Sequence, residues 1–228
     1  MGLASRSTSL ALRLASLPVV ALLFLAVLLG CLRGPGAQPG TLTYEGPQTY
    51  TLKPGDWLPG TDIRYMRKTD SGAEFVIAGQ RALKKAADSL NWSGSPAGGV
   101  KLDLRTRIIW IGDEEVRVLG TVKVVVSDVA PQPGEANTKA PLSYETPVAY
   151  GLKVGAKVPG TLVTYEGKGS DGARFSGVEG YPHRQIGDSL VWEGRLRANV
   201  ALRVVLRVVQ FSEESARLAG VAHLWISP

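Results

Sequence analysis

The sequence predicts an all-β protein, built from two tandem, duplicated, small antiparallel β-sandwich or β-barrel domains that follow an N-terminal signal or anchor helix. Three observations predict this fold class. The chain matches itself without a gap when it is shifted by 100 residues. Its last and longest apolar stretches alternate with period two, as half-buried strands do. Pro182 interrupts the second copy of a segment that would otherwise be assigned to a helix.

These observations divide the chain into five parts. We assign residues 1–31 to a signal peptide or membrane anchor and residues 32–41 to a tether. The first β domain is predicted over 42–128 and the second over 142–228, with a semi-rigid, Pro-rich linker at 129–141 between them.

The N-terminal segment has the pattern of an export signal. Arg6 and Arg13 precede an apolar stretch over 14–29, which is followed by Gly30 and Cys31. A basic region, an apolar region and a small residue before the cleavage point are typical of a bacterial secretory signal.

The tetrapeptide Leu28-Leu29-Gly30-Cys31 resembles the lipobox of bacterial lipoproteins. The resemblance implies that Cys31, the only cysteine, becomes the lipidated first residue of the mature chain. Two alternatives remain open. Residues 14–32 could stay as an uncleaved helix of about 28 Å, which barely spans a bilayer, or the chain could be fully secreted. All three alternatives place the remainder outside the cytoplasm, because Arg6 and Arg13 hold the N-terminus inside.

The duplication is extensive. When residues 42–128 are laid over 142–228, 28 of 87 positions are identical. The period of 100 residues is too long for one solenoid unit, so each copy is predicted to be a domain.

The two copies together decide the secondary structure of one ambiguous segment. Residues 78–88, AGQRALKKAAD, are rich in strong helix formers. Their counterpart, 178–188, contains Pro182, and proline inside a helix costs roughly 3 kcal/mol. A strand–turn–strand is therefore predicted in both copies.

The remaining strands follow from alternation and turn residues. The strongest are expected at 100–111 and 116–126 and at the same offsets in the second copy, with Gly120 and Gly220 at shared bulges or bends. Shorter strands are expected near 42–45, 48–52, 62–67, 73–78, 80–85 and 89–93, and 100 residues later.

Charge and composition exclude some classes of function. The net charge of +6 includes two arginines of the leader, and each copy alone carries 12 basic against 11 acidic or 10 against 8 side chains. That balance is too even for a nucleic-acid binder, which needs a dense positive field.

No pattern indicates catalysis, a metal site or a cofactor. Neither His183 nor His223 has an obvious companion of the kind that a metal or a nucleophilic triad requires. The carboxylates present in both copies, such as Asp88 and Asp188, precede turns, where they bind backbone amides. We therefore expect a protein that is not an enzyme.

Aromatic residues found in only one copy are the best candidates for binding. A position that accepts Lys or Gln in the other copy is expected near the surface, where an aromatic can bind a protein or glycan, pack between domains, or be incidental. Three basic residues beside a predicted turn are also candidates for contact with anionic headgroups or wall polymers, although a solvated edge strand guarded by Lys is the simpler explanation. The full candidate set is Trp57, Arg81, Lys84, Lys85, Trp110, Tyr181, His183 and Trp225.

The sequence thus favours a non-enzymatic protein held at the outer face of the cell membrane by a lipid or a helix. It would act as a binding, adaptor or structural module of the bacterial envelope, with an envelope protein or glycan as partner. The alternative is a ligand-binding lipoprotein that takes a glycan or small molecule at the inter-domain surface.

Overall fold

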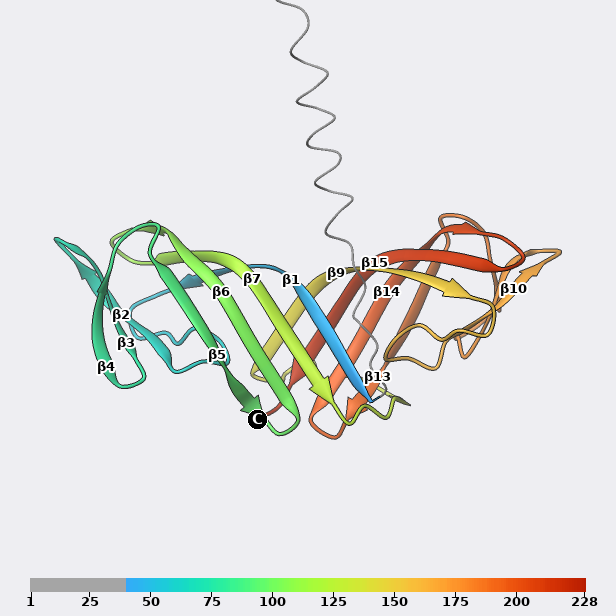
Figure 1. Ribbon diagram of the computed structural model, residues 1–228, viewed down its shortest axis with the longest axis horizontal. Coiled ribbons are helices and arrows are strands. Elements are labelled where there is room, and N and C mark those ends of the chain that lie inside the picture. The colour runs from blue at the N-terminus through green and yellow to red at the C-terminus, as the bar shows by residue number, and fades with distance from the viewer. Residues whose placement is uncertain (1–39) are drawn as a thin grey trace, which may run out of the picture. The chain divides into compact units, whose positions relative to one another are not determined.

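The computed structural model describes residues 40–228, and they form an all-β, antiparallel fold (Figure 1). The predicted fold class is confirmed. The predicted signal or anchor segment, Cys31 and tether residues 32–39 lie outside the described residues. Within residues 40–228, no helix is long and apolar enough to cross a membrane.

The first repeat consists of two sheets. Its strands are β1 (Thr41–Leu52), β2 (Ile63–Thr69), β3 (Gly72–Ile77), β4 (Gln80–Lys84), β5 (Ser89–Ala97), β6 (Val100–Ile111) and β7 (Val116–Ser127). The long strands form a four-stranded sheet in the order β1-β7-β6-β5, and the short ones form a three-stranded sheet in the order β2-β3-β4.

The second repeat has the same plan with one addition. Its strands are β9 (Leu142–Lys153), β10 (Thr164–Gly169), β11 (Gly172–Ser176), β12 (His183–Arg184), β13 (Ser189–Arg197), β14 (Val200–Phe211) and β15 (Ser215–Ile226). They form sheets β10-β11-β12 and β8-β13-β14-β15-β9, where β8 (Gln132–Pro133) comes from the linker. In the described part of the chain no sheet closes into a barrel, so the sandwich-like alternative holds.

Alternation along the strands places the core between the sheets. In β14, Val200, Leu202, Val204 and Leu206 are buried, while Arg203 and Arg207 are exposed. An aromatic pair anchors each small sheet, and the ring centroids of Tyr65 and Phe75 lie 5.3 Å apart, as do those of Tyr165 and Phe175.

The strand boundaries expected at the start of each repeat need correction. The strands expected at 42–45 and 48–52 are one continuous strand, β1, although Pro47 lies within it. Proline has no backbone N–H to donate, but β1 is the edge strand of its sheet, where an unpaired side is tolerated. Pro147 occupies the same position in β9, the edge strand of the second sheet.

The segment at 78–88 is not helical, as the argument from Pro182 predicted. It contains β4, which pairs with β3 from Ile77↔Gln80 to Ala73↔Lys84. In the second repeat the equivalent strand β12 has only two residues, and it begins directly after Pro182.

Gly120 and Gly220 occupy equivalent register positions. Gly120 lies opposite Thr106 of β6, and Gly220 lies opposite Leu206 of β14. A Cβ atom on either glycine would lie about 2 Å from a carbonyl oxygen of the neighbouring strand, at Arg105 or Val205. The neighbouring strand has a register shift a few residues away, between Ile108 and Trp110 and again between Val208 and Gln210. Only glycine allows so close a backbone approach.

The two repeats meet along the edge strands β1 and β9 (Figure 1). Side chains, rather than a backbone ladder, make the hydrogen bonds that cross this seam. Thr146 Oγ1 donates to the carbonyl of Glu45 at 3.0 Å, and the Gln48 amide donates to the carbonyl of Glu145. Thr146 lies directly over Gly46, where a Cβ atom would be 2.1 Å from its Oγ1.

A second set of contacts joins the repeats where the β13–β14 turn meets the end of β7 and the β5–β6 turn. The Arg197 guanidinium donates to the carbonyl of Ser127 at 3.0 Å and lies 3.7 Å from the carboxylate of Asp128. Asn199 donates to the carbonyl of Gly98 at 3.2 Å. The buried apolar residues of both repeats form one contiguous core. Independent folding of each repeat stays a prediction.

This shared core contains five buried tyrosine hydroxyls without a hydrogen-bond partner among residues 40–228: Tyr44, Tyr50, Tyr65, Tyr144 and Tyr150. Burial raises the pKa of Tyr44 well above its ordinary value, and the nearby Tyr150 raises it further. Burial also raises the pKa of Tyr144, with a further contribution from Tyr50. In each of these pairs the two tyrosines belong to different repeats.

Candidate functional site

Trp57 lies in the loop after β1 and is 53% exposed. It forms a β-bridge with Arg64, whose Cζ atom lies 5.6 Å from the centroid of the indole ring. Arg64 is held over the ring because its Nε atom donates to the carbonyl of Gly55 at 2.8 Å. The result is an exposed tryptophan with one face covered by a guanidinium group.

Trp110 has the same kind of partner at the end of β6. It is 45% exposed, and the Arg117 Cζ atom on β7 lies 5.1 Å from its ring centroid. Arg117 is fixed from the other side by Glu115, at 2.9 Å. The adjacent Ile109 is 50% exposed, and Leu119, which lies opposite Arg107, is 43% exposed. This end of the β6–β7 pair therefore exposes two aliphatic side chains and an aromatic one.

The second repeat keeps the backbone of both places and replaces the tryptophans. Lys157 forms the bridge with Thr164 that Trp57 forms with Arg64. Gln210 lies opposite Arg217, as Trp110 lies opposite Arg117. The fold therefore does not require an aromatic side chain at either position.

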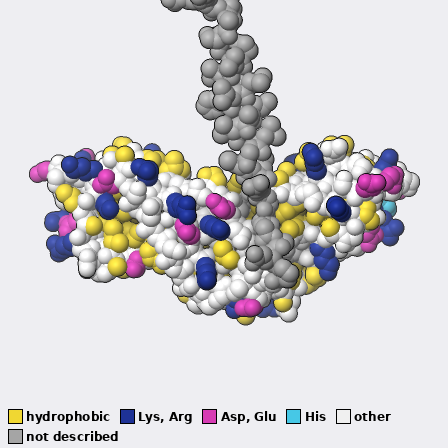
Figure 2. Space-filling view, in the orientation of Figure 1, with side chains coloured by type: hydrophobic (Ala, Val, Ile, Leu, Met, Phe, Trp, Pro, Cys, Tyr) yellow, Lys and Arg dark blue, Asp and Glu magenta, His cyan; other side chains and the backbone are white. Residues whose placement is uncertain are grey.

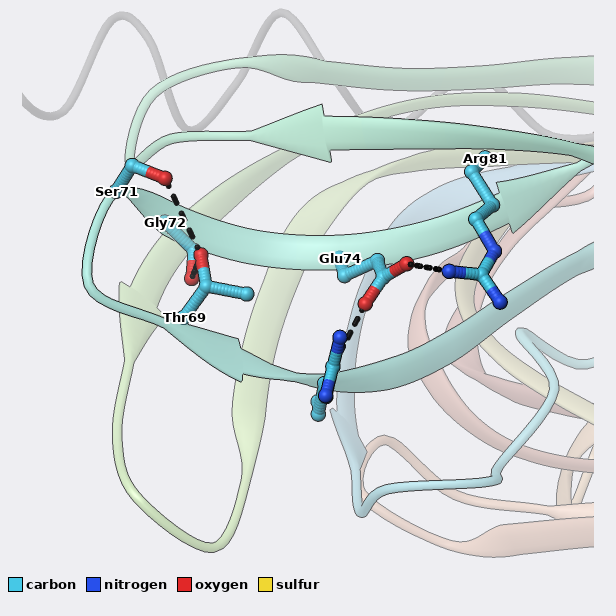
Figure 3. A network of polar contacts seen from close by, with 6 residues as sticks. Thr69, Ser71, Gly72, Glu74 and Arg81 are labelled. Carbon is cyan, nitrogen blue, oxygen red and sulfur yellow. Dashed lines mark hydrogen bonds and ion pairs between the residues drawn. The ribbon is translucent and has the colours of Figure 1, made fainter.

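The three basic candidates are not gathered into one patch. Arg81 lies on β4, and its guanidinium reaches Glu74 at 3.3 Å (Figure 3). Glu74 also accepts from Arg67 at 2.7 Å, and these cations lower the pKa of its carboxyl group. Lys84 lies three positions further along β4, so it projects to the opposite face of the strand, and the exposed Lys85 follows the strand end. Over the face drawn in Figure 2, Lys and Arg side chains alternate with acidic ones.

Tyr181 and His183 lie together beside the small sheet of the second repeat. Their ring centroids are 5.2 Å apart, and the Tyr181 hydroxyl lies 3.2 Å from a carboxylate oxygen of Asp171. His183 Nδ1 is buried and has no hydrogen-bond partner within the described residues. In the part of the chain that the structure describes, no three His, Cys, Asp or Glu side chains are arranged to hold a metal ion.

Trp225 is half-buried on the outer face of β15. The ring of His223 stacks on it, with centroids 5.9 Å apart and planes at 14°. His223 Nδ1 lies 3.3 Å from the carboxylate of Glu145 on β9. This aromatic pair has no counterpart in the first repeat, where Lys123 and Val125 occupy these positions.

The carboxylates at the predicted turns bind backbone amides. Asp88 accepts from the N–H of Lys85 at 2.8 Å, and Asp188 accepts from the N–H of Gln185 at 2.7 Å. The identical geometry in both repeats gives these residues a structural role.

The sequence prediction missed the partners of the candidate aromatics. The sequence did not predict that Arg64 and Arg117 contact these rings, because their positions over the indole rings depend on strand register. One signal was present: Trp57 and Arg64 change together, to Lys157 and Thr164, between the two copies. A pair that changes jointly within a duplicated fold indicates contact.

Comparisons with protein-family models, with curated proteins and with solved structures find no significant match.

Proposed function

We propose that this chain is a non-enzymatic, membrane-anchored, extracytoplasmic protein that acts as a binding or adaptor module of the bacterial envelope. One observation carries the proposal. Trp57 and Trp110, which each contact an arginine side chain, are exposed at positions where the second repeat has Lys and Gln. Tryptophan and arginine are the residue types most enriched among the anchors of protein–protein interfaces.

The membrane part of the proposal depends on the leader. Residues 14–29 are apolar and follow two arginines, and the lipobox-like tetrapeptide ends at Cys31. A lipid at Cys31 would leave residues 32–40 as a tether between the bilayer and the first strand, which begins at Thr41. Two or more acyl chains hold a protein firmly, at about 0.8 kcal/mol per buried CH₂.

The anchor is tested by mass. We expect protein extracted from membranes to lack residues 1–30 and to carry a lipid on Cys31, as measured by intact-mass spectrometry. The variant Cys31→Ser should remain at the unprocessed mass. A wild-type mass that retains residues 1–30 would instead favour the uncleaved helix.

The role of Trp57 is tested by its own counterpart. We expect Trp57→Lys to change the free energy of unfolding by no more than about 1 kcal/mol, because the side chain is exposed, the fold accepts Lys157 at this position, and the lost contact with Arg64 is worth about 0.5–1 kcal/mol at an exposed site. Partner binding should weaken by about 2 kcal/mol or more if Trp57 is an anchor. A thermal melt gives the first quantity, and a large loss of stability would remove Trp57 from the candidate site.

Partner capture completes the test. Cross-linking in intact membranes, followed by purification of the full chain, should recover a partner with the wild type and lose it with Trp57→Lys combined with Trp110→Gln. The matched control is Ile186→Ala, which replaces a 66% exposed apolar residue by the residue at its first-repeat counterpart, Ala86. Capture that survives the double replacement would count against the adaptor role of this surface.

A further inference from the structure

The linker between the repeats forms one wall of a cavity on the second repeat. Its strand β8 pairs with β13 at Pro133↔Gly194 and Gln132↔Arg195. The N–H of Ala136 donates to the carboxylate of Glu193 at 2.7 Å, and the N–H of Ala130 donates to the carbonyl of Leu196 at 2.8 Å. These bonds hold residues 130–136 against the edge of the sheet.

The cavity between this linker and the sheet measures about 320 Å³. That volume is near the lower end of ligand sites, which span roughly 300–1,000 Å³, and suits one small ring. Its floor includes Ala201, which is only 6% exposed although it alternates with the inward-facing residues Val200 and Leu202. Trp225 lines one side, and the ring of His223 stacks against it.

The polar groups around the cavity include two donors and two acceptors. Asn137 uses its carbonyl oxygen to accept from the N–H of Lys139, so its NH₂ group remains to donate. Asn199 uses its NH₂ group on the carbonyls of Gly98 and Ser227, so its carbonyl oxygen remains to accept. Arg195 and Glu135 also line the cavity, and neither forms an ion pair within residues 40–228.

From this arrangement we infer that the cavity is a binding site for a neutral sugar ring, such as an end unit of a glycan. The C–H face of a sugar packs on an aromatic ring, as Trp225 offers, and its hydroxyl groups both donate and accept hydrogen bonds. One cation and one carboxylate balance each other in the lining, which matches a ligand with no net charge. The amides of Asn137 and Asn199 supply the complementary donor and acceptor.

The first repeat provides the comparison. Trp225, Arg195 and Asn199 correspond to Val125, Ser95 and Gly99, and no described segment pairs with the outer edge of β5 as β8 pairs with β13. The cavity is therefore a feature of the second repeat and its linker. The inference goes beyond the proposed function, which depends on the exposed tryptophans of the first repeat.

The experiment is a titration of the purified full chain with glucose, galactose, mannose and N-acetylglucosamine. Binding of each sugar is measured by saturation-transfer-difference NMR. The protein is held in a zwitterionic detergent, because a glycoside detergent would itself supply sugar rings. We expect saturable transfer to at least one of these sugars, strongest at the ring C–H protons that face Trp225. Glucuronate serves as the anionic comparison and is expected to bind more weakly.

Variants locate the site. Trp225→Val and Arg195→Ser replace two lining residues by their first-repeat counterparts and should each weaken sugar binding at least tenfold with an unchanged melting temperature. Ile186→Ala, at an exposed residue outside the cavity lining, is the control and should bind as the wild type does. The inference is overturned if none of the four sugars binds saturably, if binding persists undiminished in Trp225→Val, or if glucuronate is the only ligand. None of these results depends on partner capture by the first repeat.

Discussion

Replacement of Gly120 by valine should cost more stability than any other single change proposed for the first repeat. A Cβ atom at this position would lie 2.1 Å from the Arg105 carbonyl oxygen and 2.5 Å from the Thr106 Cα atom. Both are backbone atoms of a central strand, so the clash cannot be relieved by rotating a side chain. We expect a loss of about 3 kcal/mol or more in the free energy of unfolding, at or above the usual range for overpacking.

Chemical denaturation of the full chain measures this loss, and Gly151→Ala is the control. Gly151 lies in the exposed part of β9, and a Cβ atom there would meet nothing within 4 Å. That variant should be neutral or slightly stabilising, because glycine inside a strand is unfavourable. Gly220→Val should behave as Gly120→Val does, since its Cβ atom would lie 2.0 Å from the Val205 carbonyl oxygen. A mild effect at both glycines would contradict the close approach of the strands.

The duplication explains why the strands could be predicted from the sequence. Each local ambiguity in one copy is resolved by the other, as Pro182 resolves the helical composition of residues 78–88. The alternation in residues 200–211 then identifies the buried face, because one face carries only apolar residues and the other carries Arg203 and Arg207. Strand β8 was not predicted, because it lies in the linker, which has no second copy for comparison.

The contacts between repeats could not be predicted in the same way. A comparison of two copies indicates what they share, whereas an interface between them depends on which residues of one face the other. Tyr44 and Tyr150 are buried on the inward faces of strands in different repeats, yet Tyr150 lies close enough to Tyr44 to raise its pKa. The predicted linker was a semi-rigid spacer, and its hydrogen bonds to Glu193 and Leu196 follow only from the fold.

The candidate binding residues also divide into those that a comparison of the two copies predicts and those that depend on the fold. Positions that differ between the copies can be identified from the sequence alone, and Trp57, Trp110 and Trp225 are candidate binding residues on that ground. Their partners could not be predicted without the structure. Arg117 contacts Trp110 because the register of β6 and β7 places them opposite each other, and His223 stacks on Trp225 because both lie on one face of β15. The linker residues around the Trp225 cavity had no counterpart to differ from, so no comparison within the chain could select them.

Exchange of two residues at the seam tests the interface between the repeats. Gly46 and Thr146 are counterparts in the duplication and lie against each other where β1 meets β9. Gly46→Thr should lose about 2–3 kcal/mol, because its Cβ atom would lie 2.1 Å from Thr146 Oγ1 and would displace the hydrogen bond from Thr146 to the Glu45 carbonyl. Thr146→Gly alone should lose about 1–2 kcal/mol, since it removes that bond and leaves a gap.

The double variant shows whether Gly46 and Thr146 contact each other or affect stability independently. If the repeats pack as described, Gly46→Thr with Thr146→Gly moves the threonine to the other side of the pair, and the new side chain occupies the space that the old one vacated. The loss of stability in the double variant should then be smaller than the sum of the two single losses by at least about 1 kcal/mol, as measured by a double-mutant cycle. Strictly additive losses would show that Gly46 and Thr146 are not in contact in solution. The positive coupling is expected because the clash in the first variant involves only the side chain that the second variant removes.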